Sequence, residues 1–251
     1  MVNVSLLSDD LDDVDTLTLV AEFYFRRKYY QEALDVYLSI SEKIPPTAQI
    51  FQKIGYCYHQ QGDIKNALIN YEHAELLNAD SAWTLRRIAA CHKSLNNPQK
   101  ALSYYERVAS MNADDLAVTM NIGHCHLELE NYKEAIKNYY KVEFLDEKST
   151  RAWRPLAWCL LLSGDFDQSS GYYSKILNDN PTAEDYLNMG HLALAQSNIS
   201  KAIESYKLSI DNKCTNVDWL IDSLKKDEKY LTKIGVDISL MPFIVDALLY
   251  S

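Results

Sequence analysis

Residues 153–181, which read WRPLAWCLLLSGDFDQSSGYYSKILNDNP, contain the pattern that decides the fold. Two apolar segments surround the turn-prone stretch 163–165, which is suited to ending one helix and capping the next. A small residue, Ala157, lies in the first segment, and in the second Ser169 is followed four residues later by Tyr173. Small side chains let helices approach closely, and a bulky ring one turn away fills the space beside them. The stretch therefore predicts a pair of packed helices.

The same pattern recurs along most of the chain with a spacing of 34 residues. In the first helix of each pair the small residue is Ala21, Gly55, Ala89, Gly123, Ala157 and, after a step of 33, Gly190. In the second helix the small residue and its tyrosine are Ala33 and Tyr37, Ala67 and Tyr71, Ala101 and Tyr105, Ala135 and Tyr139, Ser169 and Tyr173, and Ala202 and Tyr206. A fixed period of this length is the sequence signature of a helical repeat array.

Over Val14 to Asn216 the sequence resembles the tetratricopeptide-repeat family. The fifth unit matches the family pattern most fully, through Trp153, Leu156, Ala157, Phe166, Tyr173 and Pro181. The resemblance implies an all-α, right-handed superhelical solenoid of about six helix pairs with C-terminal capping helices. It also implies that the first helix of each pair lines a concave inner surface.

Three regions are expected along the chain. Residues 1–13 form an acidic lead-in, whose aspartates complement the dipole of the first helix. Residues 14–216 hold the six repeats, and residues 217–251 form capping helices, because a solenoid needs atypical ends. The final apolar segment, Ser239 to Tyr250, is expected to fold back onto the preceding helices. The alternative is that this segment forms a dimer contact or a docking site for another domain.

Charge and hydropathy narrow the classes of function. The net charge of −10 and the pI near 5.1 oppose the capture of nucleic acid, which depends on clustered Lys and Arg. The sequence has no run of 18 apolar residues, and its first eleven residues do not resemble a secretory signal. We therefore expect a soluble cytoplasmic protein that contacts neither nucleic acid nor membrane.

The cysteines and histidines look like a metal array but have the wrong spacing for one. Cys57, Cys91, Cys125 and Cys159 lie 34 residues apart, so each belongs to a different repeat. Successive helices are roughly 8–10 Å apart, whereas disulfides need shorter Cα distances and zinc sites need converging ligands. We expect the four thiols to be reduced and to fill the core. Phosphate-binding loops, metalloprotease motifs and nucleophile elbows are absent from the sequence, so we expect neither a cofactor nor an enzyme.

Candidate binding residues are those of the first helices that packing does not use. The partner-binding candidates are Gln52, Tyr56, Arg86, Asn121, His124, Arg151, Arg154, Trp158 and His191. Arginine and tryptophan are common anchors at interfaces, and arginine suits carboxylates. Three of the candidates, Arg86, Asn121 and Arg151, partly resemble the carboxylate clamp of tetratricopeptide co-chaperones. Ala90 and Pro155 depart from that clamp at its other two positions.

Two functions follow from these observations. The first is a scaffold that binds a segment of a partner protein, acidic in character, on its concave face. The second is a structural module that assembles, for example as a homodimer, through the apolar C-terminal segment. An RNA-reading repeat is disfavoured by the acidic charge. The alternative for the arginines is that they are solvated or paired with nearby acids.

Overall fold

The computed structural model describes residues 13–147, 150–213 and 217–249. In these ranges the chain is built from helices and their connecting turns, and no strand is present. The sequence-based expectation of an all-α chain of paired helices is confirmed. Most of the acidic lead-in, including Asp9, Asp10 and Asp12, lies outside the described residues, as do Asn216 and Tyr250.

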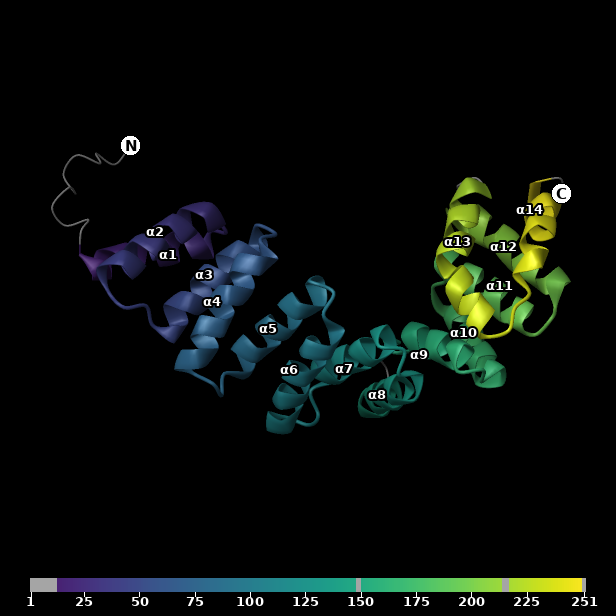
Figure 1. The fold of residues 1–251 in the computed structure, drawn as a ribbon, viewed down its shortest axis with the longest axis horizontal. Coiled ribbons are helices and arrows are strands. Elements are labelled where there is room, and N and C mark those ends of the chain that lie inside the picture. The colour runs from purple at the N-terminus through teal and green to yellow at the C-terminus, as the bar shows by residue number, and fades with distance from the viewer. Residues whose placement is uncertain (1–12, 148–149, 214–216, 250–251) are drawn as a thin grey trace. The chain divides into compact units, whose positions relative to one another are not determined.

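The first of two compact units, Met1–Ala113, contains three helix pairs. Their bounds are α1 (Val14–Arg26), α2 (Tyr30–Lys43), α3 (Ala48–Gln60), α4 (Ile64–Leu77), α5 (Ala82–Ser94) and α6 (Pro98–Met111). Each helix packs on the one that precedes it in the chain (Figure 1).

The second unit, Asp114–Ser251, contains three more pairs and the C-terminal helices. The bounds of the paired helices are α7 (Leu116–Glu128), α8 (Tyr132–Leu145), α9 (Trp153–Leu162), α10 (Phe166–Asp179), α11 (Ala183–Ala195) and α12 (Ile199–Lys213). These are followed by α13 (Val217–Lys233), the short 3₁₀ helix η2 (Ile238–Leu240) and α14 (Met241–Leu249).

Local chemistry sets where the helices begin. The side chains of Thr47, Asp63, Ser81 and Asp115 each accept a hydrogen bond from the backbone N–H three residues later. Such N-caps satisfy amides that have no partner inside the helix. Pro98 lies in the first turn of α6, where its missing N–H costs no helical hydrogen bond. These caps therefore begin α3, α4, α5 and α7 at turn-prone stretches of the sequence.

The turn inside each pair needs one residue in the left-handed region. The six positions lie 33 or 34 residues apart, and the residue is glycine in only two of them. They are Lys28, Gly62, Asn96, Glu130, Gly164 and Ser197, with φ between 58° and 84°. Only glycine adopts this conformation without a steric cost, so the other four positions store backbone strain.

The core is made by the small residues and tyrosines that define the repeat. Tyr37, Tyr71, Tyr139, Tyr173 and Tyr206 are among the largest fully buried side chains. Each ring fills the space beside a helix that the small residues allow to come close.

The fifth pair has serine in place of the alanine at this position, and the serine hydroxyl has a hydrogen-bond partner. Ser169 replaces alanine and is completely buried. Its hydroxyl donates a 2.9 Å hydrogen bond to the backbone carbonyl of Ala157 in the partner helix. The serine therefore fits the close approach of α9 and α10.

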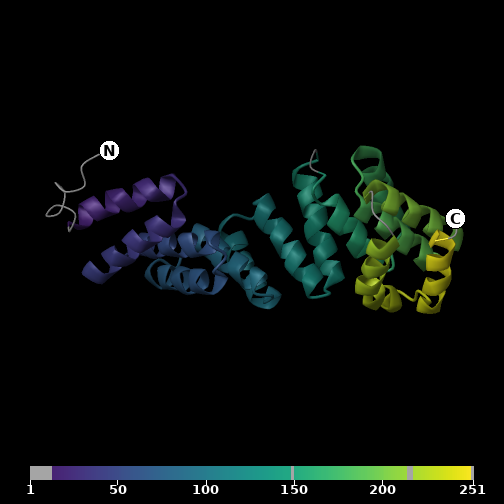
Figure 2. The same ribbon diagram turned by 90° about the horizontal axis from the view of Figure 1, so that it is seen from above.

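The C-terminal helices close the second unit. Ile244 of α14 is completely buried in one cluster with Leu220, Leu224 and Leu231 of α13. Figures 1 and 2 show α13 and α14, coloured yellow-green to yellow, beside α11 and α12. The apolar final segment thus lies against the preceding helices. None of the described helices is long and apolar enough to cross a membrane.

Candidate partner-binding surfaces

Three of the candidate residues line one pocket in the second unit. Asn121 and His124 lie on α7, and Arg151 lies in the turn before α9. The pocket has a volume of about 210 Å³, and Asp146 also contributes to its wall. Arg151 is exposed and forms no ion pair with any described residue. The pocket therefore combines a cation, an amide and an imidazole at one place.

The side chains of this pocket are oriented from within the repeat. His124 Nδ1 lies 2.9 Å from the hydroxyl of Tyr139, the buried tyrosine of the same pair. Asn121 donates one amide hydrogen to the carbonyl of Ala117, one turn earlier in α7. A carboxamide has a second donor hydrogen and a carbonyl acceptor, so Asn121 is suited to reading the polar groups of a peptide.

Arg154 has a structural partner. Its guanidinium contacts both carboxylate oxygens of Asp185 on α11 at 2.9–3.0 Å and donates to the carbonyl of Asn180 at 2.7 Å. Asp185 is buried, and it also accepts hydrogen bonds from the backbone N–H and hydroxyl of Thr182 in the capping box of α11. The same arginine–carboxylate pair therefore joins α9 to the start of α11.

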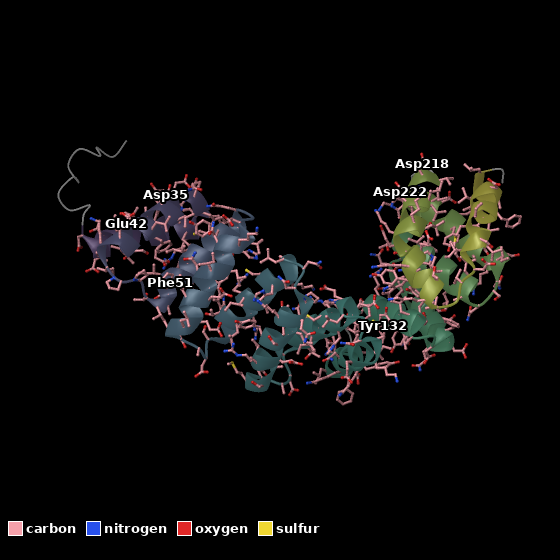
Figure 3. The ribbon with its side chains drawn as sticks, in the orientation of Figure 1. Asp35, Glu42, Phe51, Tyr132, Asp218 and Asp222 are labelled. Atoms are coloured by element: carbon pink, nitrogen blue, oxygen red, sulfur yellow. The ribbon has the colours of Figure 1, made fainter. Side chains whose placement is uncertain are left out.

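Trp158 and His191 are covered by the chain's own helix α13. Trp158 packs edge-on against Tyr230, with ring centroids 5.7 Å apart. His191 is fully buried between Tyr206 Oη, at 2.9 Å from Nδ1, and Asp227 Oδ2, at 3.3 Å from Nε2. These contacts use the second half of α13. Figure 3 labels Asp218 and Asp222 on its first half.

The end of α13 reaches the turn between α7 and α8. Lys233 forms an ion pair with Glu130, which lies 103 residues earlier in the sequence. Beyond Glu130 the chain enters α8 near Tyr132, which is labelled in Figure 3. The helix thus contacts residues of the fourth, fifth and sixth pairs. It occupies part of the surface that the first helices present in this unit.

Gln52 and Tyr56 line a pocket in the first unit together with residues that were not predicted from the sequence. The pocket has a volume of about 450 Å³, and its remaining wall is formed by Phe25, Gln49, Lys53, Trp83 and Arg87. Gln52 donates a 2.8 Å hydrogen bond to the hydroxyl of Thr84. Arg86, on α5, is half-buried and does not line this pocket.

A repeat-based signal could have found the additional residues. Lys53 and Arg87 lie 34 residues apart, at equivalent positions of α3 and α5. Phe25 and Trp83 lie on α1 and α5, the helices on either side of α3. Equivalent positions of successive first helices lie on the same face. Aligning the first helices by the 34-residue period therefore pairs Lys53 with Arg87.

The four regularly spaced cysteines are reduced and completely buried, apart from one another in successive first helices. Burial raises the pKa of Cys57 and Cys159 to about 12 and that of Cys91 to about 11. A thiol that stays protonated is neither a good nucleophile nor a good metal ligand. Among the described residues, no group of three His, Cys, Asp or Glu side chains could hold a metal ion.

Two segments of the chain match family models described as Tetratricopeptide repeat, at residues 48–81 and 92–147. No curated protein matches the sequence significantly.

Several solved structures have the same fold. The structure of YrrB, a TPR protein with an unusual peptide-binding site, has a TM-score of 0.63 and 17% identity, covering 70% of this chain and 91% of YrrB. MamA from Desulfovibrio magneticus RS-1 has a TM-score of 0.62 and 16% identity, covering 66% and 93%. A tetratricopeptide repeat protein from Parabacteroides merdae has a TM-score of 0.57 and 18% identity, covering 90% and 86%. At these identities the likeness concerns the fold.

Proposed function

This chain is a tetratricopeptide-repeat protein, and from that premise we propose that it is a binding scaffold rather than an enzyme, with an acidic segment of a partner protein as its ligand. The observation that carries the proposal is the pocket formed by Asn121, His124 and Arg151. Arginine presents a fork of donors that matches a carboxylate, and an asparagine beside it can read the ligand's backbone. YrrB, which has this fold, is itself described as having a peptide-binding site.

The polarity of the pocket sets the orientation of the ligand. Arg151 attracts a carboxylate, whereas Asp146 in the same wall repels one and favours a donor group. An extended peptide offers both kinds of group, because its backbone N–H groups alternate with its side chains. We therefore propose that an acidic side chain meets Arg151 while a backbone N–H faces Asp146.

Arg154, Trp158 and His191 have a different place in the proposal. Arg154 is engaged with buried Asp185, and the other two lie beneath α13. We propose that these residues stabilise the second unit, and that the Asn121, His124 and Arg151 pocket contacts the partner.

The test is a pull-down from native lysate with a matched charge control. The variant is Asn121→Ala combined with Arg151→Glu, and the control is Lys137→Glu, an exposed residue of the second helix α8. We expect proteins captured by the unmodified chain and by the control to be lost with the double variant, as identified by mass spectrometry. Capture of the same proteins by all three chains would refute the pocket as the contact site.

A second function, homodimer formation through the C-terminal segment, is favoured by the exposed apolar side chains of α14. Phe243 is 61% exposed and Leu249 is 56% exposed. Two such residues on a nine-residue helix form a small apolar surface that a second copy could cover. We expect Phe243→Glu to convert a dimer to a monomer in analytical ultracentrifugation. A monomeric unmodified chain at high micromolar concentration would exclude this function.

We further propose a cytoplasmic location, because four reduced cysteines in the core suit a reducing compartment. Microscopy of the tagged protein in its own cell tests this assignment. Accumulation in an oxidising compartment would contradict it.

A further inference from the structure

Two cationic side chains, Lys53 and Arg87, line the pocket among α1, α3 and α5, and they differ in whether a carboxylate is bound to them. Lys53 is neutralised, because its ammonium group lies 3.0 Å from a carboxylate oxygen of Glu22 and 4.0 Å from the centroid of the Phe25 ring. Arg87 forms no ion pair with a described residue. The Glu22 carboxylate neutralises Lys53 but not Arg87. The positive charge of Arg87 is therefore uncompensated at the pocket wall.

Aromatic rings hold Arg87 in place. Its guanidinium carbon lies 5.1 Å from the centroid of the Tyr56 ring and 5.1 Å from that of the Trp83 ring. Contact with aromatic faces stabilises the cation but uses none of its N–H donors. The guanidinium is thus pre-organised while its hydrogen-bonding capacity is still available for a ligand. Less conformational entropy is lost when an anion binds to such a group.

The ring of Trp83 gives the pocket an apolar side. Trp83 is 41% exposed although its ring packs against Tyr71, with centroids 5.8 Å apart. An indole that is half open beside a fixed arginine can bury an apolar side chain of the same ligand. The pocket thus offers one anion-binding group and one apolar surface next to each other.

The exposed acidic residues Asp35 and Glu42 of the neighbouring helix do not belong to the pocket lining. Asp35 and Glu42, labelled in Figure 3, are exposed on α2, and neither lines the pocket. Glu22, which contacts the pocket residue Lys53, also accepts a 2.8 Å hydrogen bond from the Tyr37 hydroxyl. The cationic character of this pocket therefore persists in a chain whose net charge is −10.

We propose that this pocket is a second binding site, which takes a carboxylate of a protein segment at Arg87 and an adjacent apolar side chain on Trp83. A singly charged carboxylate matches one uncompensated guanidinium through two parallel hydrogen bonds. A phosphate group carries nearly twice the charge and would require more cations than the pocket supplies. The site lies in the first unit and uses none of the residues of the Asn121, His124 and Arg151 pocket, so either can fail without the other.

The experiment uses the full chain and an array of random twelve-residue peptides. One array is attached through the peptide C-termini, so that only side chains supply carboxylates, and a second is attached through the N-termini, so that terminal carboxylates are also free. Every chain in this experiment carries Asn121→Ala and Arg151→Glu, which remove the acidic-peptide site of the second unit, and the chain with only these two changes is the parent chain. The variants made in this parent chain are Arg87→Gln and Arg107→Gln. Arg107 is a matched control, because it too lies over a tyrosine ring, Tyr104 at 5.2 Å, but it is paired with Glu75 on the row of second helices.

We expect the parent chain and Arg107→Gln to retain peptides in which Asp or Glu stands beside an apolar residue. Arg87→Gln should bind these peptides at least tenfold more weakly, while its thermal transition by circular dichroism stays within a few degrees of the parent chain. Retention in the second array alone would assign the terminal carboxylate as the ligand group. The proposal is overturned if the retained peptides show no excess of carboxylates, or if Arg87→Gln binds them as tightly as the parent chain.

Discussion

At the scale of single residues, each repeat is defined by one close approach between a small residue and a tyrosine ring. A methyl group added at Gly123 would lie 2.7 Å from Tyr139 Cε1, and one added at Gly55 would lie 2.9 Å from Tyr71 Cδ1. The first, third and fifth pairs have alanine at this position instead. The helix spacing is therefore tightest where the sequence has glycine.

Gly190→Ala should destabilise the protein, because its methyl group would overlap ring carbons of Tyr206 that are fully buried. Overpacking of this kind costs about 1–3 kcal/mol in the free energy of unfolding. The control is Gly171→Ala on α10, where nothing lies within 4 Å, and which should stabilise by about 0.5–1 kcal/mol. Urea titration followed by circular dichroism measures both values. Equal effects of the two substitutions would contradict the close approach.

The buried thiols should be inert in the folded protein. Because burial raises the pKa of Cys57, Cys91 and Cys159 above 10, these groups remain protonated at pH 9, where an exposed thiol is largely ionised. We expect iodoacetamide to modify them far more slowly at pH 9 than after unfolding in urea, as measured by peptide mass mapping. Rapid modification of the native protein at these three positions would show that the first helices open readily.

Several predicted binding residues occupy the position that follows the small residue of a first helix. The residue after the small position of each first helix is Glu22, Tyr56, Ala90, His124, Trp158 or His191. In three pairs this side chain hydrogen-bonds the buried tyrosine, through Glu22 to Tyr37, His124 to Tyr139 and His191 to Tyr206. A polar residue here therefore has a packing role as well as any contact with a ligand.

At the scale of elements, α13 is more than an end cap. Its second half contacts Trp158, His191 and Glu130, which belong to the fifth, sixth and fourth pairs. Other helix contacts in the unit are mainly between neighbours in the chain. This helix therefore ties together three pairs that are separated in sequence.

Tyr230→Ala should loosen α13 from the face that it covers. Removing the ring takes away its edge-on contact with Trp158, while Lys226→Ala alters only an exposed position of the same helix. We expect hydrogen exchange of the α13 amides to accelerate about tenfold or more in Tyr230→Ala, equivalent to about 1.4 kcal/mol of local stability. Unchanged exchange, or the same acceleration in Lys226→Ala, would contradict this role of Tyr230.

At the scale of the whole molecule, the contacts are dominated by helices that follow one another in the chain. The stability of such an array is approximately a sum of repeat and nearest-neighbour terms. A local change should therefore have a local effect. This distinguishes a repeat protein from a globular domain with a single shared core.

The destabilisation by Gly190→Ala should consequently be confined to the helices around Tyr206. Residues of α11, α12 and α13 form one hydrophobic cluster with Tyr206. We expect hydrogen exchange to become faster in these three helices and to stay unchanged in α1 to α4. Exchange mapped by mass spectrometry provides the measurement. A uniform increase along the chain would indicate that all six pairs unfold as one cooperative unit.

The sequence by itself determined the helix pairs, their period and the residues that pack between them. Small residues and tyrosines recur at fixed spacings, and each repeat makes mainly local contacts. A pair such as Ala67 and Tyr71 therefore predicts the same helix packing wherever it recurs. The turn positions follow the same period, from Lys28 to Ser197. These features depend on neighbours in the sequence and were therefore predictable.

The tertiary structure alone decided which candidate side chains face a pocket and which have internal partners. Arg154 and Arg151 are three residues apart, yet Arg154 is bound to Asp185, 31 residues away, and Arg151 lines an exposed pocket. The placement of α13 over Trp158 and the enclosure of Arg87 by two rings also arise from contacts between helices. Such contacts depend on side-chain direction and on the rotation of each helix about its axis, neither of which is encoded in residue spacing.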